Sequence, residues 1–460
     1  MNNTLKKSPN IIFILTDQQR FDSLGCYGQK LKVSPNIDKM AAEGVQFEHV
    51  FSNQPVCGPA RSILQTGKYA TETRCYRNGI ALPIDEETLA KYFSEVGYEV
   101  GYLGKWHLAS TSGRSKDIKL EKVKNMITPI PEQYRGGYKD YWLASDLLEF
   151  TSNAFDGHLF DKDDNQIDFN GYRVDCMTDF VLEYLSMRDK SKPLFFFLSF
   201  LEPHQQNDQN EIIGPKGSKK KFKNYGVPGD LQGMKGDWKD FYPDYLGCCN
   251  SIDHNVGRII NKIKELNMEE NTIIIFTSDH GCHFRTRNWE YKRSCHDASI
   301  RIPLIINGKG FKGGKRISEL VSLINLPPTL LECAGIPIPK DMKGKPLQQL
   351  LNGNSQNWPD DVFIQISETQ VGRSIRTHKW KYSVEAPNKD GILYSKSEIY
   401  EETFLYDLEN DPHEKQNLIA KPEFIDDRKE LSSLLKQRMI EAGESAPIII
   451  PQDSLDMKVH

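Results

Sequence analysis

The sequence lacks a strong excess of charge of either sign. Its 59 Lys and Arg residues nearly balance its 63 Asp and Glu residues, and the formal net charge is −4. A protein that attracts nucleic acid or an anionic membrane through a general electrostatic field needs a clear basic excess. The composition therefore excludes such a field, and any anion-binding site in this chain must be local.

The sequence also lacks an apolar run long enough to cross a bilayer. The longest runs, such as Leu194–Leu198, and shorter ones such as Ile273–Phe276, fall far short of the about twenty residues that a membrane helix needs. Behind the basic N-terminus, the stretch Ile11–Leu15 ends in Thr16-Asp17 without a small-residue cleavage site. We expect no transmembrane segment and no export signal in the chain as given, which favours the cytoplasm. Removal of a signal peptide would leave the same sequence and would make the protein periplasmic or secreted.

The sequence also lacks paired Cys-x-x-Cys motifs, and it has no low-complexity tract apart from the basic loop at residues 216–223. The nine cysteines are odd in number and irregular in spacing, which is typical of free thiols in a reducing compartment. With 33 Gly, 24 Pro and 38% hydrophobic residues, the chain is an ordinary globular protein. Its 460 residues are enough for two or three structural units, or for one large unit with an appendage.

What the chain does have is a series of short β-rich runs separated by segments of helical periodicity. Near-continuous apolar strands between helices indicate a largely parallel sheet that is covered on both faces. The sequence therefore predicts an α/β fold, with a helix at Tyr245–Leu266. The runs that we interpret as strands are Asn10–Thr16, Val100–Leu103, Pro193–Leu201, Thr272–Ser278 and Leu304–Asn307.

The pattern changes past residue 350. The short runs Val362–Ile366, Ser374–Ile375 and Trp380–Ser383 are typical of antiparallel strands, and a helix is predicted at Asp426–Ala442. We therefore predict a main α/β domain over residues 1–355 and a smaller C-terminal α+β subdomain over residues 356–460.

Two predicted strands end in residues that bind metal ions in other proteins. Asp17 and Gln18 follow the first strand, and Asp279 and His280 follow the strand Thr272–Ser278. Sites in open α/β sheets gather at the carboxyl edge of the strands, and such an oxygen-rich set favours Ca²⁺ or Mg²⁺ over zinc. For either segment alone, a carboxylate that merely caps a helix or turn is the better interpretation; for the pair, that alternative is weaker.

The segment Cys57-Gly-Pro-Ala-Arg61 has the pattern of a helix start. Pro59 suits the first helical turn, so Cys57 should lie at the helix N-terminus, where free N–H groups and the helix dipole favour an anion. Arg61 adds a planar donor group. The alternative is that Cys57 is a small buried apolar residue or a thiol of low pKa.

Further charged and imidazole side chains also follow or approach predicted strand ends. Two lysines would hold a tetrahedral anion as point charges, and two histidines would move protons near neutral pH. For each one taken alone, a solvated lysine or a structural histidine is the simpler interpretation. These residues are Lys105, His107, His204 and Lys292.

Together these segments resemble the sulfatase family of the alkaline phosphatase superfamily. The Cys-x-Pro-x-Arg signature and the Asp-His-Gly strand end occur in the order that the family has, along most of the chain. The matching segments are Thr16-Asp-Gln-Gln-Arg20, Cys57-Gly-Pro-Ala-Arg61, Gly104-Lys-Trp-His107, Pro203-His204, Ser278-Asp-His-Gly281, Lys292 with Arg301-Ile-Pro-Leu304, and Leu405-Tyr-Asp-Leu408 with Asp411-Pro412.

The resemblance implies a cofactor and a maturation partner. Cys57 would be oxidised to formylglycine by a formylglycine-generating or an anaerobic sulfatase-maturating enzyme, and the hydrated aldehyde would be the nucleophile. The implied ligands of Ca²⁺, with Mg²⁺ as the alternative, are residue 57, Asp17, Gln18, Asp279 and His280. Family members often have Asp where this chain has Gln18, which removes one negative charge from the site. His280 replaces the Asn of some members, and the alternative for it is a donated hydrogen bond in place of a bond to the ion.

The resemblance also implies roles for the remaining residues. Arg61, Lys105 and Lys292 would neutralise the sulfate oxygens. His204 would protonate the leaving oxygen, and His107 would act as the base that restores the aldehyde, with the exchange of these two roles as the alternative.

The segment between Cys282 and Asp297 should overhang the pocket and select the substrate. An aromatic ring with Arg and His side chains suits a sugar, and the Arg-rich pattern resembles sulfatases that act on sulfated carbohydrates. We therefore expect a sulfated saccharide as substrate. The alternatives are a phosphonate monoester or phosphodiester hydrolase of the same superfamily, and a non-catalytic glycan-binding descendant. The expected substrate-binding residues are Arg285, Arg287, Trp289, His296 and Asp297. For each of these residues the alternative is that it only braces the loop.

Overall fold

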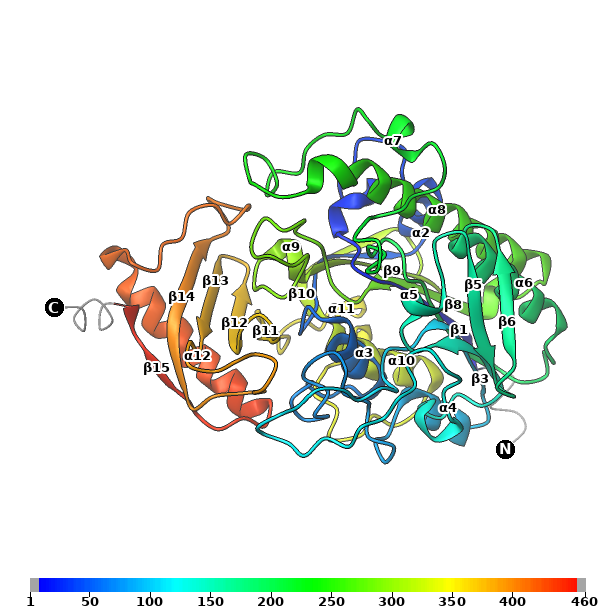
Figure 1. Cartoon of the computed structure of the whole chain (residues 1–460), viewed down its shortest axis with the longest axis horizontal. Helices are drawn as coiled ribbons and strands as arrows, with labels where there is room; N and C mark the ends of the chain where they lie inside the picture. Colours follow the sequence, from blue (N-terminus) through cyan, green and yellow to red (C-terminus); the bar gives the residue numbers. More distant parts are fainter. Residues whose placement is uncertain (1–7, 453–460) are drawn as a thin grey trace.

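A ten-stranded sheet forms the centre of the computed structural model, which describes residues 8–452. Its strand order is β10-β2-β9-β8-β1-β7-β3-β4-β5-β6, and the five strands from β8 to β4 pair in parallel (Figure 1). The predicted α/β class is confirmed. These five are β8 (Thr272–Ser278), β1 (Asn10–Thr16), β7 (Leu194–Ser199), β3 (Glu99–Lys105) and β4 (Tyr141–Ser145). The flanking strands are β10 (Lys315–Ser322), β2 (Val45–Phe51), β9 (Arg301–Gly308), β5 (Asp156–Asp161) and β6 (Gln166–Asn170).

The alternation of side chains along β1 explains why helices cover both faces of this sheet. Ile11, Phe13 and Leu15 belong to one core cluster, and Ile12 and Ile14 belong to the other. The first cluster includes residues of α3 (Cys57–Thr66), α4 (Leu89–Glu95) and α10 (Leu326–Ala334). The second includes residues of α2 (Pro35–Glu43), α6 (Arg173–Met187) and α8 (Trp238–Glu265). The short helices are α5 (Leu148–Thr151), α7 (Ser218–Lys221), α9 (Asp297–Ile300) and α11 (Gln348–Leu351).

Helix α8 begins at Trp238 rather than at the predicted Tyr245, because the helix continues through Pro243. Proline in a helix interior removes one backbone hydrogen bond and normally marks a boundary. Here the buried residues before it, Trp238 and Tyr242, pack in a separate core cluster with the loop that contains Phe284 and Tyr291. Tertiary packing therefore outweighs the local preference for a helix end.

A second, five-stranded sheet forms the C-terminal subdomain (Figure 1, orange and red). It is antiparallel up to β14, as predicted, and β14 then pairs in parallel with the short last strand. Helix α12 (Ile425–Glu441) packs on it through Leu431 and Leu435. The strands are β11 (Asp361–Ile366), β12 (Gly372–Thr377), β13 (Trp380–Glu385), β14 (Ile399–Asp407) and β15 (Ile448–Ile450).

Within residues 8–452, none of the helices combines the length and the apolar character that crossing a bilayer requires. All nine cysteines lie in this part of the chain, and each of them is a free thiol.

Candidate active site

The register between β1 and β8 brings two carboxylates together at the carboxyl edge of the sheet. Thr16 pairs with Ser278, so the residues that follow, Asp17 and Asp279, leave adjacent strands at the same level. The backbone N–H of Gln18 donates to Oδ1 of Asp279 at 3.1 Å. Both carboxylates are completely buried. Two buried acids this close require positive charge between or beside them.

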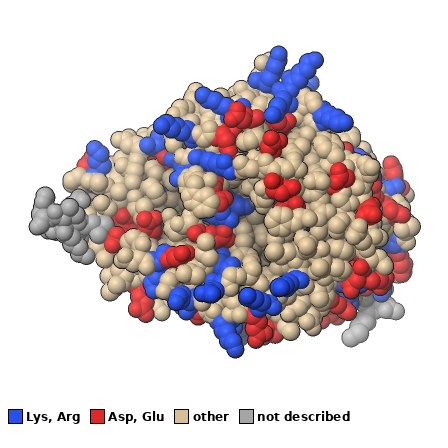
Figure 2. Space-filling view, viewed as in Figure 1, with Lys and Arg blue, Asp and Glu red and all other residues tan. Residues whose placement is uncertain are grey.

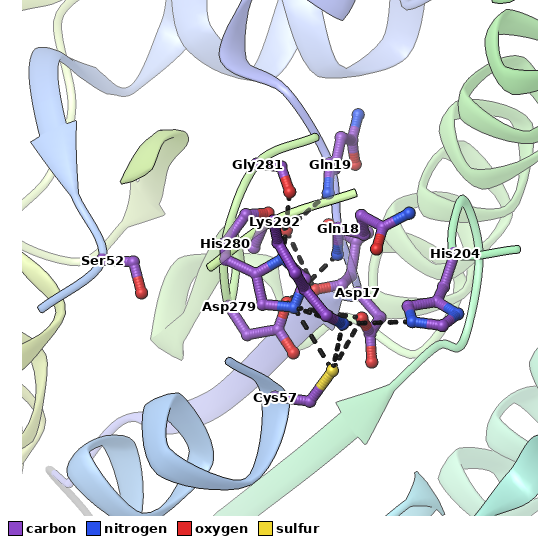
Figure 3. A network of polar contacts seen from close by, with 12 residues as sticks. Asp17, Gln18, Gln19, Ser52, Cys57, His204, Asp279, His280, Gly281 and Lys292 are labelled. Carbon is purple, nitrogen blue, oxygen red and sulfur yellow. Dashed lines mark hydrogen bonds and ion pairs between the residues drawn. The ribbon is translucent and has the colours of Figure 1, made fainter. Parts of the chain in front are cut away.

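Cys57 completes a group of four potential metal ligands. It is the first residue of α3, as predicted, and its Sγ lies 3.2 Å from Nε2 of His280 and 3.4 Å from Oδ1 of Asp17. One ligand atom from each of Asp17, Cys57, Asp279 and His280 lies within 4.8 Å of the others. Figure 3 shows these side chains turned toward one another.

Three cations surround this group. Nζ of Lys105 lies 2.9 Å from Oδ2 of Asp17, and Nη2 of Arg61 lies 3.2 Å from the same oxygen. Arg61 is also fixed by donating to the carbonyl of Lys105 and to Ser199 Oγ, each at 2.7 Å. Nζ of Lys292 lies 2.8 Å from Cys57 Sγ. The pocket is therefore locally positive, although the chain as a whole carries a net charge of −4.

These contacts shift the pKa values of the buried groups. Burial raises the pKa of the Cys57 thiol, but Lys292, Lys105 and His280 outweigh this effect, so the pKa lies well below its ordinary value. Burial also raises the pKa of Asp17, yet Lys105 and the neighbouring cations lower it overall. Burial and the adjacent Asp17 raise the pKa of Asp279. The pocket therefore stabilises an anion at residue 57.

Both histidines of the predicted mechanism are buried near the pocket. Nε2 of His204 is 3.1 Å from Nζ of Lys292, and its Nδ1 is 2.6 Å from the carbonyl oxygen of Gln205. His107 is buried, its Nδ1 has no hydrogen-bond partner among residues 8–452, and its proximity helps to lower the pKa of Cys57. Both imidazoles are therefore within reach of a group bound at residue 57.

The residues present fit a hard divalent cation. Oε1 of Gln18 is buried and accepts no hydrogen bond from any described residue, and Oδ2 of Asp279 has only a 3.4 Å ion-pair contact with Nη2 of Arg61. Buried acceptors are normally satisfied, so the unpartnered amide oxygen beside two carboxylates indicates a partner such as a cation. Two carboxylates and an amide oxygen are the ligands that Ca²⁺ and Mg²⁺ prefer.

The loop that follows β8 places its predicted substrate-binding residues in different surroundings. Trp289 is 73% exposed, and the partly exposed Arg285 lies over the ring of Tyr291 and donates to Asn210 Oδ1 at 2.6 Å. Arg287 instead donates to the backbone carbonyls of His413 and Glu414, each at 2.7 Å. Trp289 remains open to a ligand, and Arg285 is partly exposed but also pairs with Asp237 at 3.5 Å. Arg287 anchors the loop to the C-terminal subdomain.

His296 and Asp297 were expected to bind ring hydroxyls, and the structure gives them other partners. Asp297 is buried and pairs with Lys381 at 2.7 Å and with Arg376 at 3.3 Å. His296 is buried between Ser294 and Tyr406, with contacts of 3.2 and 3.1 Å. The polar atoms of both side chains therefore have protein partners at the boundary with the second sheet.

Sequence reasoning missed Glu149, which lies beside the pocket. Its Oε1 is 3.4 Å from Nζ of Lys105, and its Oε2 is buried without a hydrogen-bond partner among residues 8–452. The available signal was its position shortly after β4, because Lys105 and Ser145 pair at the ends of β3 and β4.

Arg20, the last residue of the matching segment Thr16–Arg20, has a structural position beside the pocket. Its guanidinium is buried between Asp22 and Asp230, at 2.7 Å from each, and it donates to the carbonyl of Cys282 at 2.7 Å. It therefore ties the start of the substrate loop to the segment that follows β1.

The surface over this part of the molecule is hollowed. On the face shown in Figure 2, Lys and Arg side chains gather around a recess near the middle of the view, between the main body and the C-terminal sheet. A local basic surface of this kind attracts an anionic ligand although the chain as a whole carries a net charge of −4.

Comparison with known proteins identifies the family. The model described as "Sulfatase" matches residues 9–336, and the model "N-sulphoglucosamine sulphohydrolase, C-terminal" matches residues 286–442. An N-acetylglucosamine-6-O-sulfatase of Bacteroides thetaiotaomicron is 25% identical, over 96% of this chain and 88% of that protein.

Solved structures share the fold. One, determined in complex with its substrate D-glucosamine-2-N,6-O-disulfate, has a TM-score of 0.76 at 23% identity and covers 95% of this chain and 98% of its own. A phosphonate monoester hydrolase of Agrobacterium radiobacter has a TM-score of 0.67 at 21% identity, with 94% and 96% coverage. The fold is thus common to enzymes of different specificity. Because the sulfatase model spans most of the main domain and meets the Cys57 signature there, the chain belongs to the sulfatase family and is a hydrolase of that family.

Proposed function

We propose that this protein hydrolyses a sulfate monoester on a sulfated carbohydrate, at the pocket around residue 57. The observation that carries the proposal is the arrangement of Lys105, Lys292 and Arg61 around the N-terminus of α3, beside two buried carboxylates. A sulfate monoester bears a single negative charge, which such a cluster neutralises at close range.

The reaction would need two components that the sequence does not encode: formylglycine at residue 57, and a divalent cation beside Asp17 and Asp279. Formylglycine, made from Cys57 by a maturing enzyme, supplies an oxygen nucleophile, and Ca²⁺ or Mg²⁺ supplies fixed positive charge. Asp17, Gln18, Asp279 and His280, with residue 57, would hold the cation. A hard cation matches an oxygen nucleophile better than a thiolate, which is the chemical reason for the conversion.

The side chains of the protein would position the ester. Lys105 and Lys292 bind the non-bridging oxygens from two directions, and Arg61 keeps its orientation through the contacts with Lys105 and Ser199. Charges fixed before the reaction need no reorganisation when the transition state forms, and this is usually the largest contribution to catalysis.

His204 would protonate the leaving oxygen. When its Nδ1–H donates to the carbonyl of Gln205, Nε2 is the nitrogen that faces Lys292 and the ester. His107 would remove the proton whose loss releases sulfate and restores the aldehyde. The exchange of these two roles is the alternative.

Arg285 and Trp289 would contact the carbohydrate. An exposed aromatic ring stacks on the apolar face of a sugar, and a partly free guanidinium binds hydroxyl or sulfate oxygens. The sulfated saccharides named for the similar proteins are consistent with this class of substrate.

The test is a side-by-side measurement of aryl sulfate, aryl phosphonate and a panel of sulfated saccharides, with protein coexpressed with a maturing enzyme. We expect sulfate release from an aryl sulfate and from at least one saccharide, and none from the Cys57→Ala variant. A preference for the phosphonate would assign the protein to the alternative hydrolase class. Saccharide binding without turnover of any ester would support a glycan-binding protein instead.

A further inference from the structure

A continuous chain of polar side chains connects Glu149 with Gln18. The Nδ2 of Asn207 donates to Oε1 of Glu149 at 3.1 Å, and the Nε2 of Gln205 donates to Oδ1 of Asn207 at 3.1 Å. The Nε2 of Gln18 then donates to Oε1 of Gln205 at 2.7 Å. These contacts join α5, the loop after β7 and the residue that follows Asp17.

The carboxylate at one end determines the direction of every hydrogen bond in this chain. Burial raises the pKa of Glu149, but Lys105 and the neighbouring histidines lower it overall, so this side chain is ionised. An ionised carboxylate only accepts hydrogen bonds. Asn207 must therefore turn its NH₂ group toward Glu149 and its oxygen toward Gln205. The same constraint passes to Gln205, whose oxygen faces Gln18.

The last amide is thereby left with one free end, and that end is an oxygen. With Nε2 of Gln18 committed to Gln205, its Oε1 is buried and accepts no hydrogen bond within the described part of the chain. A reversed amide would instead turn two N–H donors toward the group formed by Asp17 and Asp279, which suits a cation poorly. Gln18 carries no charge, so the orientation of its amide decides whether it is a ligand at all.

We propose that Glu149 is a positioning residue that, through Asn207 and Gln205, holds the carbonyl oxygen of Gln18 toward the bound cation. This inference rests on the cation site of the proposed function and adds a reason why an amide serves there in place of a carboxylate. Residues that orient a metal ligand typically change the affinity for the metal by about 10- to 100-fold when they are replaced.

The test is the affinity for Ca²⁺ alone, measured by isothermal titration calorimetry on the full chain. Asn207 is exposed, so Asn207→Ala interrupts the chain without disturbing the core and without changing the net charge. We expect this variant to bind Ca²⁺ about 10-fold more weakly than the wild type. Gln209→Ala removes an exposed amide of the same loop that donates to Asn153 instead, and should leave the affinity unchanged.

A double-mutant cycle distinguishes orientation of the amide from a general effect on the site. In a Gln18→Asp background, residue 18 has no amide to orient, so Asn207→Ala should then have no effect on Ca²⁺ affinity. Equal losses in both backgrounds, or no loss in the wild-type background, would overturn the proposal. Turnover of an aryl sulfate, measured in parallel, shows separately whether the proposed function holds. A wild type that binds no Ca²⁺ would overturn the inference even if it hydrolysed the ester.

Discussion

The buried ammonium of Lys292 contacts one thiol and two imidazoles. Its Nζ lies 2.8 Å from Cys57 Sγ and 3.1 Å from Nε2 of both His204 and His280. Lys292 thereby links the predicted nucleophile, acid and metal ligand, and the position of each depends on the others.

The acid role of His204 predicts a dependence on the leaving group. In His204→Ala, turnover of substrates with poor alcohol leaving groups should fall by about 10²- to 10⁴-fold, because their oxygen needs a proton. Activated aryl sulfates should lose much less, since their leaving group is stable as an anion. Steady-state kinetics on a series of phenols of different pKa measures this. A uniform loss across the series would remove His204 from the acid role.

Buried His283 predicts a loss of stability in acid. Burial lowers its pKa from 6.5 to about 4, its Nε2 contacts the carbonyl of Lys292 at 3.0 Å, and its Nδ1 has no hydrogen-bond partner among residues 8–452. Between pH 6.5 and 4 the unfolded chain binds a proton that the folded chain rejects, so this contribution is present above pH 6.5 and is lost as the pH falls.

The measurement is the free energy of unfolding in denaturant across this pH range. His283→Gln keeps a donor for the carbonyl and should flatten the pH dependence by up to about 1.4 kcal/mol per pH unit. The exposed His254, changed to Gln, serves as the matched control. An unaltered slope in His283→Gln would contradict the assignment.

At the level of secondary-structure elements, a buried cluster of charged side chains links the second sheet to the loop that contains Lys292. Lys381 on β13 donates to Asp297, to Glu414 and to the carbonyl of Cys295, each at 2.7 Å. Arg287 donates to the carbonyl of the same Glu414. The C-terminal subdomain therefore contacts the chain on both sides of Lys292. In this way a sheet outside the main domain helps to position Lys292.

Loss of Lys381 should destabilise the whole chain. Lys381→Met would leave the carboxylates of Asp297 and Glu414 buried with less compensating charge, at a cost of about 3–5 kcal/mol. Lys379→Met, an exposed neighbour that lies over the ring of Trp380, is the control and should cost less than about 1 kcal/mol. Chemical denaturation compares the two. Similar small losses would mean that the cluster does not fasten the subdomain.

For the molecule as a whole, the bound cation should contribute to stability. Asp17 and Asp279 already have Arg61 and Lys105 as partners, so the apo chain should fold. Ca²⁺ at 100 times its dissociation constant should then add about 2.7 kcal/mol. Thermal unfolding with Ca²⁺ and with a chelator measures the difference. A melting temperature that ignores Ca²⁺, or that still responds to it in Asp17→Asn, would contradict the proposed ligands.

Much of the central architecture was predictable because its signals are local. Strands β1 and β8 are uninterrupted apolar runs that end in Asp17 and Asp279, so their bounds and the edge where they meet follow from the sequence alone. The start of α3 at Cys57 follows in the same way from Pro59. Parallel strands carry their residues to one edge, and this explains why strand-end residues assemble into one pocket.

The remainder depended on contacts between distant segments. Nothing near Asp297 in the sequence indicates that Lys381 neutralises it. The sequence therefore suggested a contact with the substrate, whereas the structure shows an ion pair within the protein. The connection from Glu149 to Gln18 involves three separate segments and amides whose orientation only the assembled pocket determines. Local patterns therefore located the pocket, whereas tertiary contacts determine which nearby side chains remain free to bind a ligand.

The central claim is that Cys57 is the precursor of an oxygen nucleophile. Mass spectrometry of the tryptic peptide covering residues 40–61, from protein coexpressed with a formylglycine-generating or anaerobic maturing enzyme, tests it most directly. We expect a lighter peptide in which an aldehyde replaces the thiol of residue 57. The fraction of peptide with this aldehyde should rise in proportion to the specific activity of each preparation. A peptide that keeps its unmodified thiol in protein that hydrolyses sulfate esters at full rate would contradict the central claim.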